Sequence, residues 1–133
     1  MKILAVDTAT KSCSVAIVDN DSMLAEVTIV REQTHSKHLM EMINSVIDLS
    51  GLTVSELDGF AVTRGPGTFT GLRIGISSVK GLAMASGKPV VGVSSLDVLA
   101  MQASNSSYLI CPLLDARRGE VYCSRYRFRD GNL

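Results

Sequence analysis

Apolar runs separated by short polar turns predict three consecutive strands at the start of the chain. The strands are expected at Lys2 to Asp7, Cys13 to Asp19 and Met23 to Val30. Strands joined by such short turns pair with their neighbours in the opposite direction. The chain is therefore expected to open with an antiparallel meander.

Apolar positions then recur with helical spacing in three segments, and two short apolar runs separate these segments. Helices are predicted from Thr34 or Ser36 to about Ser50, over Thr70 to Ser86, and from Ser94 or Ser95 to about Ala103. Strands are predicted at Phe60 to Thr63 and Pro89 to Val93. The order β-β-β-α-β-α-β-α predicts an α/β fold in which a mixed sheet carries helices on its faces.

The start of this pattern recurs near the end of the chain. Residues 114–119 (LDARRG) align with residues 6–11 (VDTATK), and each block is a strand end with an aspartate followed by a turn. Strands are expected at Tyr108 to Leu114 and Glu120 to Phe128. We therefore expect a first domain at 1–107 and the first hairpin of a duplicated, incomplete second domain at 108–133. On this interpretation the chain is a fragment, with a hairpin edge left uncovered.

The helix after strand Phe60 to Thr63 contains an unusual row of small residues. Each glycine in a helix interior lowers helix stability by about 0.5–1 kcal/mol relative to alanine, so we expect close packing against this helix to compensate for the loss. Helical spacing forms one row from Gly71, Gly75, Ser78, Gly81 and Ala85. Two explanations fit this row: tight packing of the helix on its own sheet, or close approach of a second subunit.

Composition narrows the classes of function. The chain has 133 residues, of which 46% are hydrophobic, and its formal net charge is zero. Such a chain can bury a core and has no obvious nucleic-acid footprint. No apolar run reaches the roughly 18 residues of a membrane span. Cys13, Cys111 and Cys123 lack metal-ligand spacing, so a reduced, cytosolic protein is the simplest interpretation.

The turn after the first strand is the strongest candidate for chemistry. A β-β-β-α-β-α-β-α unit is the plan of the actin-like ATPase and sugar-kinase superfamily, in which this turn holds nucleotide phosphates. Asp7 and the hydroxyl of Thr10 suit that role, but Ala9 stands where close approach to a phosphate favours glycine. The alternative is a purely structural turn that Asp7 caps. The loop Gly65-Pro66-Gly67 before the next helix could also bind an anion, but the indication is weak because Pro66 lacks an N–H donor.

Metal binding and nucleophilic catalysis find little support in the sequence. His35 and His38 are three residues apart and can share a helix face, but no third ligand is suitably spaced. The cysteines have no histidine–aspartate pair beside them, and no serine lies in a nucleophile-elbow pattern. We therefore expect no catalytic residue, no metal site and no cofactor site.

Three segments resemble the TsaB (YeaZ) family, which belongs to the bacterial machinery that makes threonylcarbamoyladenosine in tRNA. They are ILAVDTATKSCSVAI, QTHSKHL and TRGPGTFTGLRIGISSVKGLA, and the later PLLDARRGEVY is similar to the start of that family's second domain. The resemblance implies an actin-like, ribonuclease-H-like (ASKHA) fold and a cytoplasmic scaffold subunit without catalysis of its own. It implies that the chain pairs with the catalytic subunit TsaD, that the ATPase TsaE joins them, and that the chain forms a homodimer when TsaD is absent. It also implies that the chain contacts tRNA only through the complex and does not bind membranes.

The resemblance also implies which surface pairs with the partner. In the family the first two helices form the partner surface, and the small-residue row lies on the second of them. The expected partner interface consists of His35, Leu39, Met40, Ile43, Ile47, Gly71, Gly75, Ser78, Gly81, Leu82 and Ala85. Ser95 and Leu99 stand where TsaD-like proteins carry two metal-binding histidines, so no ligand pair is expected here.

Two other classes of function remain open from the sequence. An actin-like ATPase or kinase would use Asp7 and Thr10 to hold a magnesium nucleotide, and binding of ATP by the isolated chain would favour it. A glycoprotease-like metallopeptidase would require bound iron or zinc together with proteolysis.

Overall fold

A five-stranded mixed sheet organises the molecule, with the strand order β3-β2-β1-β4-β5. The computed structural model describes residues 1–30 and 37–128. The predicted meander is confirmed, because β2 pairs antiparallel with both β1 and β3. Strand β4 pairs parallel with β1 and with β5. The bounds are β1 (Lys2–Asp7), β2 (Ser12–Asp19), β3 (Ser22–Val30), β4 (Gly59–Gly65) and β5 (Val90–Ser94).

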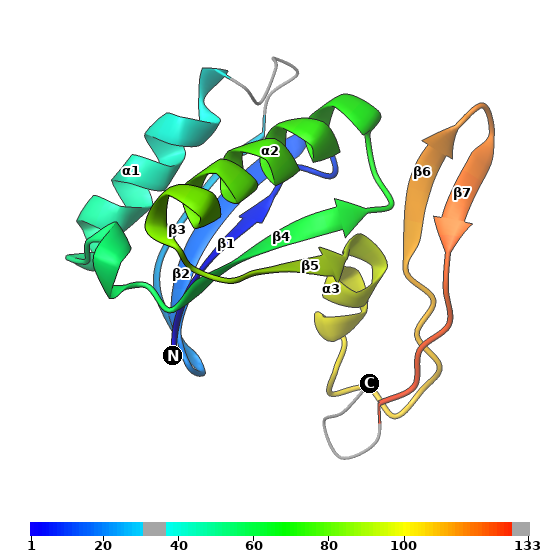
Figure 1. Ribbon diagram of the computed structural model, residues 1–133. Helices are drawn as coiled ribbons and strands as arrows, with labels where there is room; N and C mark the ends of the chain where they lie inside the picture. The colour runs from blue at the N-terminus through cyan, green and yellow to red at the C-terminus, as the bar shows by residue number, and fades with distance from the viewer. Residues whose placement is uncertain (31–36, 129–133) are drawn as a thin grey trace.

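Two helices cover one face of this sheet side by side (Figure 1). Helix α1 lies against β2 and β3, and α2 lies mainly against β4. A short 3-10 turn, η2, follows α1 and begins with a capping box formed by Thr53 and Glu56. The bounds are α1 (Leu39–Ser50), η2 (Val54–Glu56), α2 (Phe69–Ser86) and α3 (Ser95–Met101). The predicted order of strands and helices is therefore confirmed.

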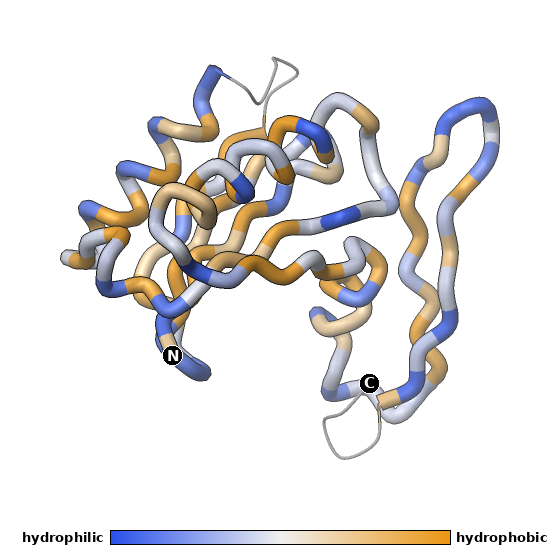
Figure 2. The backbone as a smooth tube through the Cα atoms, viewed as in Figure 1, coloured by the Kyte–Doolittle hydropathy of each residue, from blue (hydrophilic) through white to orange (hydrophobic). Residues whose placement is uncertain are grey.

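The main core lies between the sheet and the pair α1–α2. Alternate residues of the central strands point into it, and Leu4, Val15 and Phe60 are almost completely buried. Figure 2 shows these strands as largely hydrophobic. On the opposite face Ala5 pairs with Ala16 of β2 and with Ala61 of β4. The three alanines line a shallow, apolar hollow beside α3.

The end of the described chain forms a separate two-stranded sheet of β6 (Leu113–Arg117) and β7 (Glu120–Cys123). The expected strands at Tyr108 to Leu114 and Glu120 to Phe128 were wrong in their bounds. The register shifts between Asp115 and Arg117, and beyond Leu113 and Cys123 the only strand-type pairing between described residues is the bridge from Ile110 to Tyr126. A hairpin with few partners cannot keep long strands regular.

The hairpin repeats a detail of the first strand pair. Asp7 Oδ1 accepts a hydrogen bond from the amide of Ala9 at 2.9 Å, and Asp115 Oδ1 accepts one from the amide of Arg117 at 2.7 Å. Both aspartates therefore cap their turns two residues ahead, as the alignment of the two blocks suggests. The division at residue 107 stays a prediction.

One side-chain contact ties the hairpin region to α3. The Tyr126 hydroxyl donates to Asp97 Oδ1 at 2.6 Å, and this hydrogen bond is the main cause that raises the pKa of Tyr126. Among the described helices, none combines the length and hydropathy needed to cross a bilayer.

Candidate functional site

Asp7 ends β1, and its carboxylate is engaged by neighbouring groups. The Oδ1 atom accepts from the amide of Ala9 and from the hydroxyl of Thr63 on β4, each at 2.9 Å. These bonds join the turn to the next strand of the sheet. The arrangement fits a structural turn capped by Asp7, the alternative that the sequence left open.

The loop Gly65-Pro66-Gly67 closes over the same turn. The amide of Thr68 donates to the carbonyl of Ala9 at 2.7 Å, and a Cβ placed on Gly67 would lie 2.4 Å from that carbonyl oxygen. Ala9 is only 1% exposed. Because the loop packs directly on Ala9, the turn has no open backbone cradle there for a phosphate.

Thr8 explains two of the glycines in α2. Its hydroxyl donates to the carbonyl of Gly71 at 2.7 Å, and a Cβ placed on Gly75 would lie 2.3 Å from Thr8 Oγ1. Both glycines are buried. The expectation that Gly71 and Gly75 lie on a partner surface was therefore wrong, because they let the helix approach its own β1–β2 turn.

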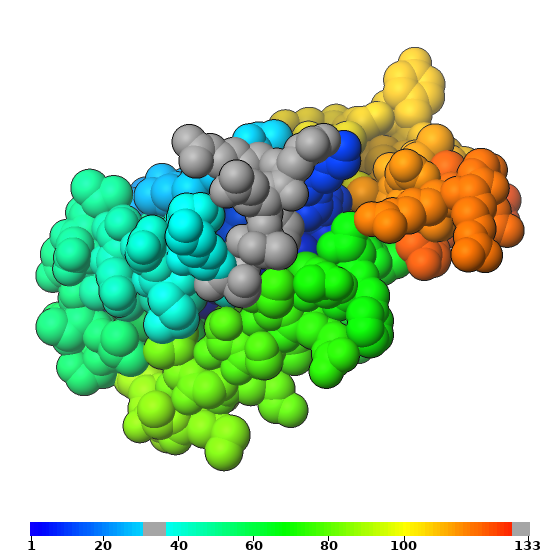
Figure 3. All heavy atoms as spheres, turned by 90° about the horizontal axis from the view of Figure 1, so that it is seen from above, coloured from blue at the N-terminus to red at the C-terminus, as the bar shows by residue number. Residues whose placement is uncertain are grey.

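The other residues proposed for the partner interface fall into three groups. Leu39 and Ile43 are each 1% exposed and belong to the core, so they support the surface from beneath. His35 lies outside the described residues. The remaining six are partly or fully exposed along α1 and α2, and we call them the helix-pair surface: Met40, Ile47, Ser78, Gly81, Leu82 and Ala85. In Figure 3 the atoms of α1 (cyan to teal) lie next to those of α2 (green).

Gly81 differs from the two buried glycines. A Cβ placed on it would meet no heavy atom within 4 Å, and Gly81 itself is exposed. Nothing in the described fold therefore requires glycine at this position, where the helix pays an intrinsic penalty of about 0.5–1 kcal/mol. Close packing of another molecule against α2 would explain the glycine at this position.

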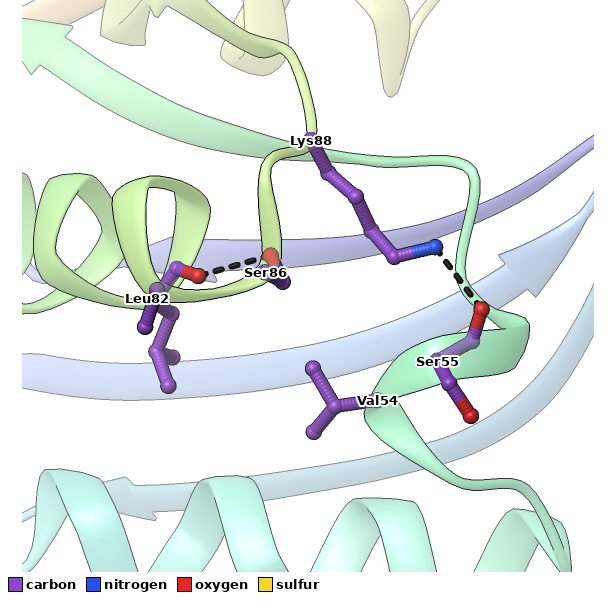
Figure 4. A pocket seen from close by; sticks show the side chains of 6 residues that line it. Val54, Ser55, Leu82, Ser86 and Lys88 are labelled. Carbon is purple, nitrogen blue, oxygen red and sulfur yellow. Dashed lines mark hydrogen bonds between the residues drawn. The ribbon is translucent and has the colours of Figure 1, made fainter.

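A pocket lies at one end of the helix-pair surface, between η2 and the end of α2. The side chains of Val54 and Leu82 line it from opposite sides (Figure 4). The ammonium group of Lys88 donates to the carbonyls of Ser55 and Leu57, so it fastens the loop after α2 to η2. Its hydrogen bonds to main-chain carbonyls give Lys88 a structural role.

Of the two histidines considered for metal binding, the structure describes His38, and His35 lies outside the described residues. Within the described part of the chain, no group of three or more His, Cys, Asp or Glu side chains is placed to hold a metal ion. His38 Nδ1 lies 3.5 Å from Glu41 Oε2, beside the start of α1. Ser95 is buried in the first turn of α3, and its hydroxyl has no hydrogen-bond partner among the described residues.

The three cysteines differ in reactivity. Burial raises the pKa of the Cys13 thiol, and the negative charge of Asp7 raises it further, whereas Cys111 and Cys123 are exposed. Because the thiolate is the nucleophile, Cys13 is expected to be inert at neutral pH. In a native titration with a chromogenic disulfide, two thiols per chain should react quickly and the third only after unfolding. Rapid reaction of all three would contradict the buried setting of Cys13, and the Cys13→Ser variant supplies the control.

Comparisons with known proteins agree on one family. The family model described as TsaD, tRNA N6-adenosine threonylcarbamoyltransferase, matches residues 22–133. The chain is 38% identical over 134 residues to a protein of Escherichia coli named tRNA threonylcarbamoyladenosine biosynthesis protein TsaB, and the alignment covers 99% of this chain. It is 35% identical to the protein of the same name in Bacillus subtilis, with 100% of this chain covered.

Solved structures give the same result. The structure titled YeaZ from Pseudomonas aeruginosa superposes with a TM-score of 0.90 at 37% identity, covering 98% of this chain and 62% of that one. A hexokinase of the ROK type from Thermus thermophilus matches at a TM-score of 0.59 with 14% identity, which shows a shared fold alone. The chain spans 57% of the length of the Escherichia coli relative and 58% of the Bacillus subtilis one. The chain has the actin-like α/β fold and belongs to the TsaB (YeaZ) family, within the wider family described by the TsaD model.

Proposed function

We propose that this chain acts in the biosynthesis of threonylcarbamoyladenosine in tRNA as a non-catalytic subunit that supports a catalytic partner of the TsaD type. The observation that carries the proposal is that the groups of the turn after β1 are bound to other parts of the same fold. Asp7 Oδ1 is bound by Ala9 and Thr63, and the loop at Gly67 packs on the turn. In an actin-like fold this turn is where a nucleotide would be held, and here its groups stabilise the fold.

The helix-pair surface supports the partner role. Met40 is 44% exposed, and Gly81 and Ala85 are exposed beside partly buried Ile47 and Leu82. Apolar and small side chains on two adjacent helices let another helix pair pack closely. We propose that TsaD occupies this surface, that a second copy occupies it when TsaD is absent, and that TsaE and tRNA join the assembled complex in the cytoplasm.

Reconstitution tests this function. The chain is mixed with ATP, threonine, bicarbonate and unmodified tRNA, alone or together with TsaD, TsaE and the enzyme that supplies the threonylcarbamoyl donor. We expect modified nucleoside, measured by mass spectrometry after digestion, only in the complete mixture, and a large loss when this chain is left out. Product formed by the chain with the donor-supplying enzyme alone would show catalysis and defeat the proposal.

ATP binding separates the proposal from an ATPase function. Isothermal titration of the isolated chain with Mg·ATP should show no binding, because Asp7 and Ala9 are engaged within the fold. Saturable binding that Asp7→Asn abolishes, in a variant that circular dichroism shows to be folded, would favour the actin-like ATPase class.

A further inference from the structure

The neutral net charge of the chain hides a separation of charge along the sequence. Residues 1–58 contain four lysine or arginine residues and nine acids, whereas residues 59–128 contain eight lysine or arginine residues and three acids. The first segment forms β1, β2, β3 and α1, and the second forms β4, β5, α2, α3 and the β6–β7 hairpin. Because the strand order is β3-β2-β1-β4-β5, the acidic and basic elements lie toward opposite edges of the sheet.

Half of the basic residues of the second segment belong to the hairpin and the residues that follow it. They are Arg117, Arg118, Arg125 and Arg127, and all four are exposed. None of their guanidinium groups forms a salt bridge with another described residue. Of the two acids in the hairpin, Asp115 caps the turn through its Oδ1 atom and Glu120 is exposed. The four positive charges are therefore available to a neighbouring molecule.

The tip of the hairpin holds two of these arginines in a backbone conformation that arginine rarely adopts. The φ angles of Arg117 and Arg118 are 66° and 54°, in the left-handed region. Residues with a Cβ are uncommon there, and short hairpin loops favour asparagine, aspartate and glycine at such positions. Asparagine at both positions would form the same turn with less strain. The local fold therefore gives no reason for two arginines at the tip.

Two adjacent guanidinium groups on an exposed tip suit a partner that is rich in phosphate. Each guanidinium carries a fixed positive charge and can donate two parallel hydrogen bonds to the oxygens of one phosphate group. At a rise of about 3.3 Å per residue, the extended chain separates Arg117 from Arg125 by roughly 26 Å, which is longer than one nucleotide. The four arginines can therefore contact several phosphates of a polynucleotide at once.

The hairpin lies away from the first helix of the helix-pair surface. In Figure 1 it lies beyond β5 and α3, on the side of the molecule opposite α1, and Figure 3 shows the same separation from a second direction. A protein partner on the helix-pair surface and a polynucleotide on the hairpin can therefore bind at the same time.

We propose that the arginines of the hairpin, with Arg117 and Arg118 at its tip, bind the phosphate backbone of tRNA. This proposal rests on the proposed function, because it assigns where tRNA touches this chain in the assembled complex. Leu113 and Val121, which are exposed between the tip and Arg125, have no side-chain donor or acceptor for a base. The contact therefore adds affinity and orientation, and it does not select a sequence.

Conservative changes at the tip test the contact. The tip variant carries Arg117→Asn and Arg118→Asn, which removes two positive charges while asparagine keeps the left-handed turn. The control variant carries Lys2→Gln and Lys37→Gln, which removes two positive charges from the acidic segment. The isolated chain and its complex with TsaD are each titrated into fluorescein-labelled, unmodified tRNA. Fluorescence anisotropy gives the dissociation constant over a series of KCl concentrations, and thermal melting checks the folding of each variant.

The phosphate contact predicts a specific set of results. The tip variant should melt at the wild-type temperature or above it, because asparagine tolerates the left-handed conformation. Its dissociation constant for tRNA should rise at least about tenfold, and the slope of log affinity against log salt should fall by about 1 to 2, because two phosphate contacts are lost. The control variant should keep the wild-type affinity and slope.

Other outcomes overturn the proposal. A folded tip variant with wild-type affinity for tRNA and a wild-type salt slope would show that the tip makes no contact. Equal losses in the tip and control variants would show that only net charge matters. A tip variant that loses affinity for TsaD and keeps its affinity for tRNA would assign the hairpin to a protein partner. Binding of Mg·ATP that the tip variant abolishes would assign the tip to a free nucleotide.

The phosphate contact and the proposed function fail separately. If the tip variant binds tRNA as wild type does while the complete mixture still makes modified nucleoside, the phosphate contact fails and the proposed function stands. If the wild-type chain neither binds TsaD nor supports the modification, the proposed function fails. The titration of the isolated chain with tRNA then still decides whether the tip binds phosphate.

Discussion

Replacing Gly75 by leucine is expected to unfold the chain or to lower its free energy of unfolding by more than about 3 kcal/mol. The first atom of any side chain there would lie 2.3 Å from Thr8 Oγ1. To make room, α2 must move off the β1–β2 turn and lose the hydrogen bond from Thr8 to Gly71. Urea unfolding followed by circular dichroism measures the loss.

Two companion variants make the result specific. Gly81→Ala changes an exposed glycine of the same helix that has open space at its Cβ, so it should stabilise the chain by about 0.5–1 kcal/mol. Gly75→Ala combined with Thr8→Ala should cost less than the sum of the two single changes, because the clashing oxygen is gone. A Gly75→Leu protein with wild-type stability would contradict the packing described here.

The contrast between these glycines marks where sequence reasoning reached its limit. Helical spacing placed Gly71, Gly75 and Gly81 in one row, but such a row covers a broad arc of the helix. Thr8, whose hydroxyl bonds to Gly71, lies far away in the chain, and only the folded sheet brings it to that arc. One part of the row therefore belongs to the core and the other part to the surface.

The order of the elements was predictable for a local reason. Apolar runs such as residues 3–6 and alternating segments such as residues 13–18 specify strands, and glycines 51 and 87 end α1 and α2 in the left-handed conformation. The hairpin strands were harder to predict. Their apolar residues suggest long strands, but Leu113 and Val121 remain exposed, and no third strand among the described residues extends the pairing.

The sequence identified Asp7 as important and left its role open. An aspartate at the end of a strand suits a metal-nucleotide site and a turn cap equally well. The deciding partner is Thr63 on β4, whose hydroxyl reaches the same oxygen as the amide of Ala9. This bond depends on the parallel pairing of β1 with β4, which a local sequence pattern does not reveal.

Met40→Glu is expected to leave the chain folded and to weaken TsaD binding at least about 100-fold. The side chain is 44% exposed on the flank of α1 toward α2, so a carboxylate there stays hydrated in the free chain. In the proposed complex it would be buried without a partner, and the burial of a methionine, roughly 1.5–3 kcal/mol, would also be lost. Ala85→Glu on α2 should act in the same way.

Leu49→Glu is the matched control, because it places the same charge on the same helix. Leu49 is 69% exposed and lies on the flank of α1 turned away from α2, so TsaD binding should keep its wild-type affinity. Calorimetric titration with TsaD and thermal melting of each variant separate binding from folding. Wild-type binding by a folded Met40→Glu protein would place the partner on another face. Equal losses in Met40→Glu and Leu49→Glu would indicate that charge on α1, and not the helix-pair surface, governs the affinity.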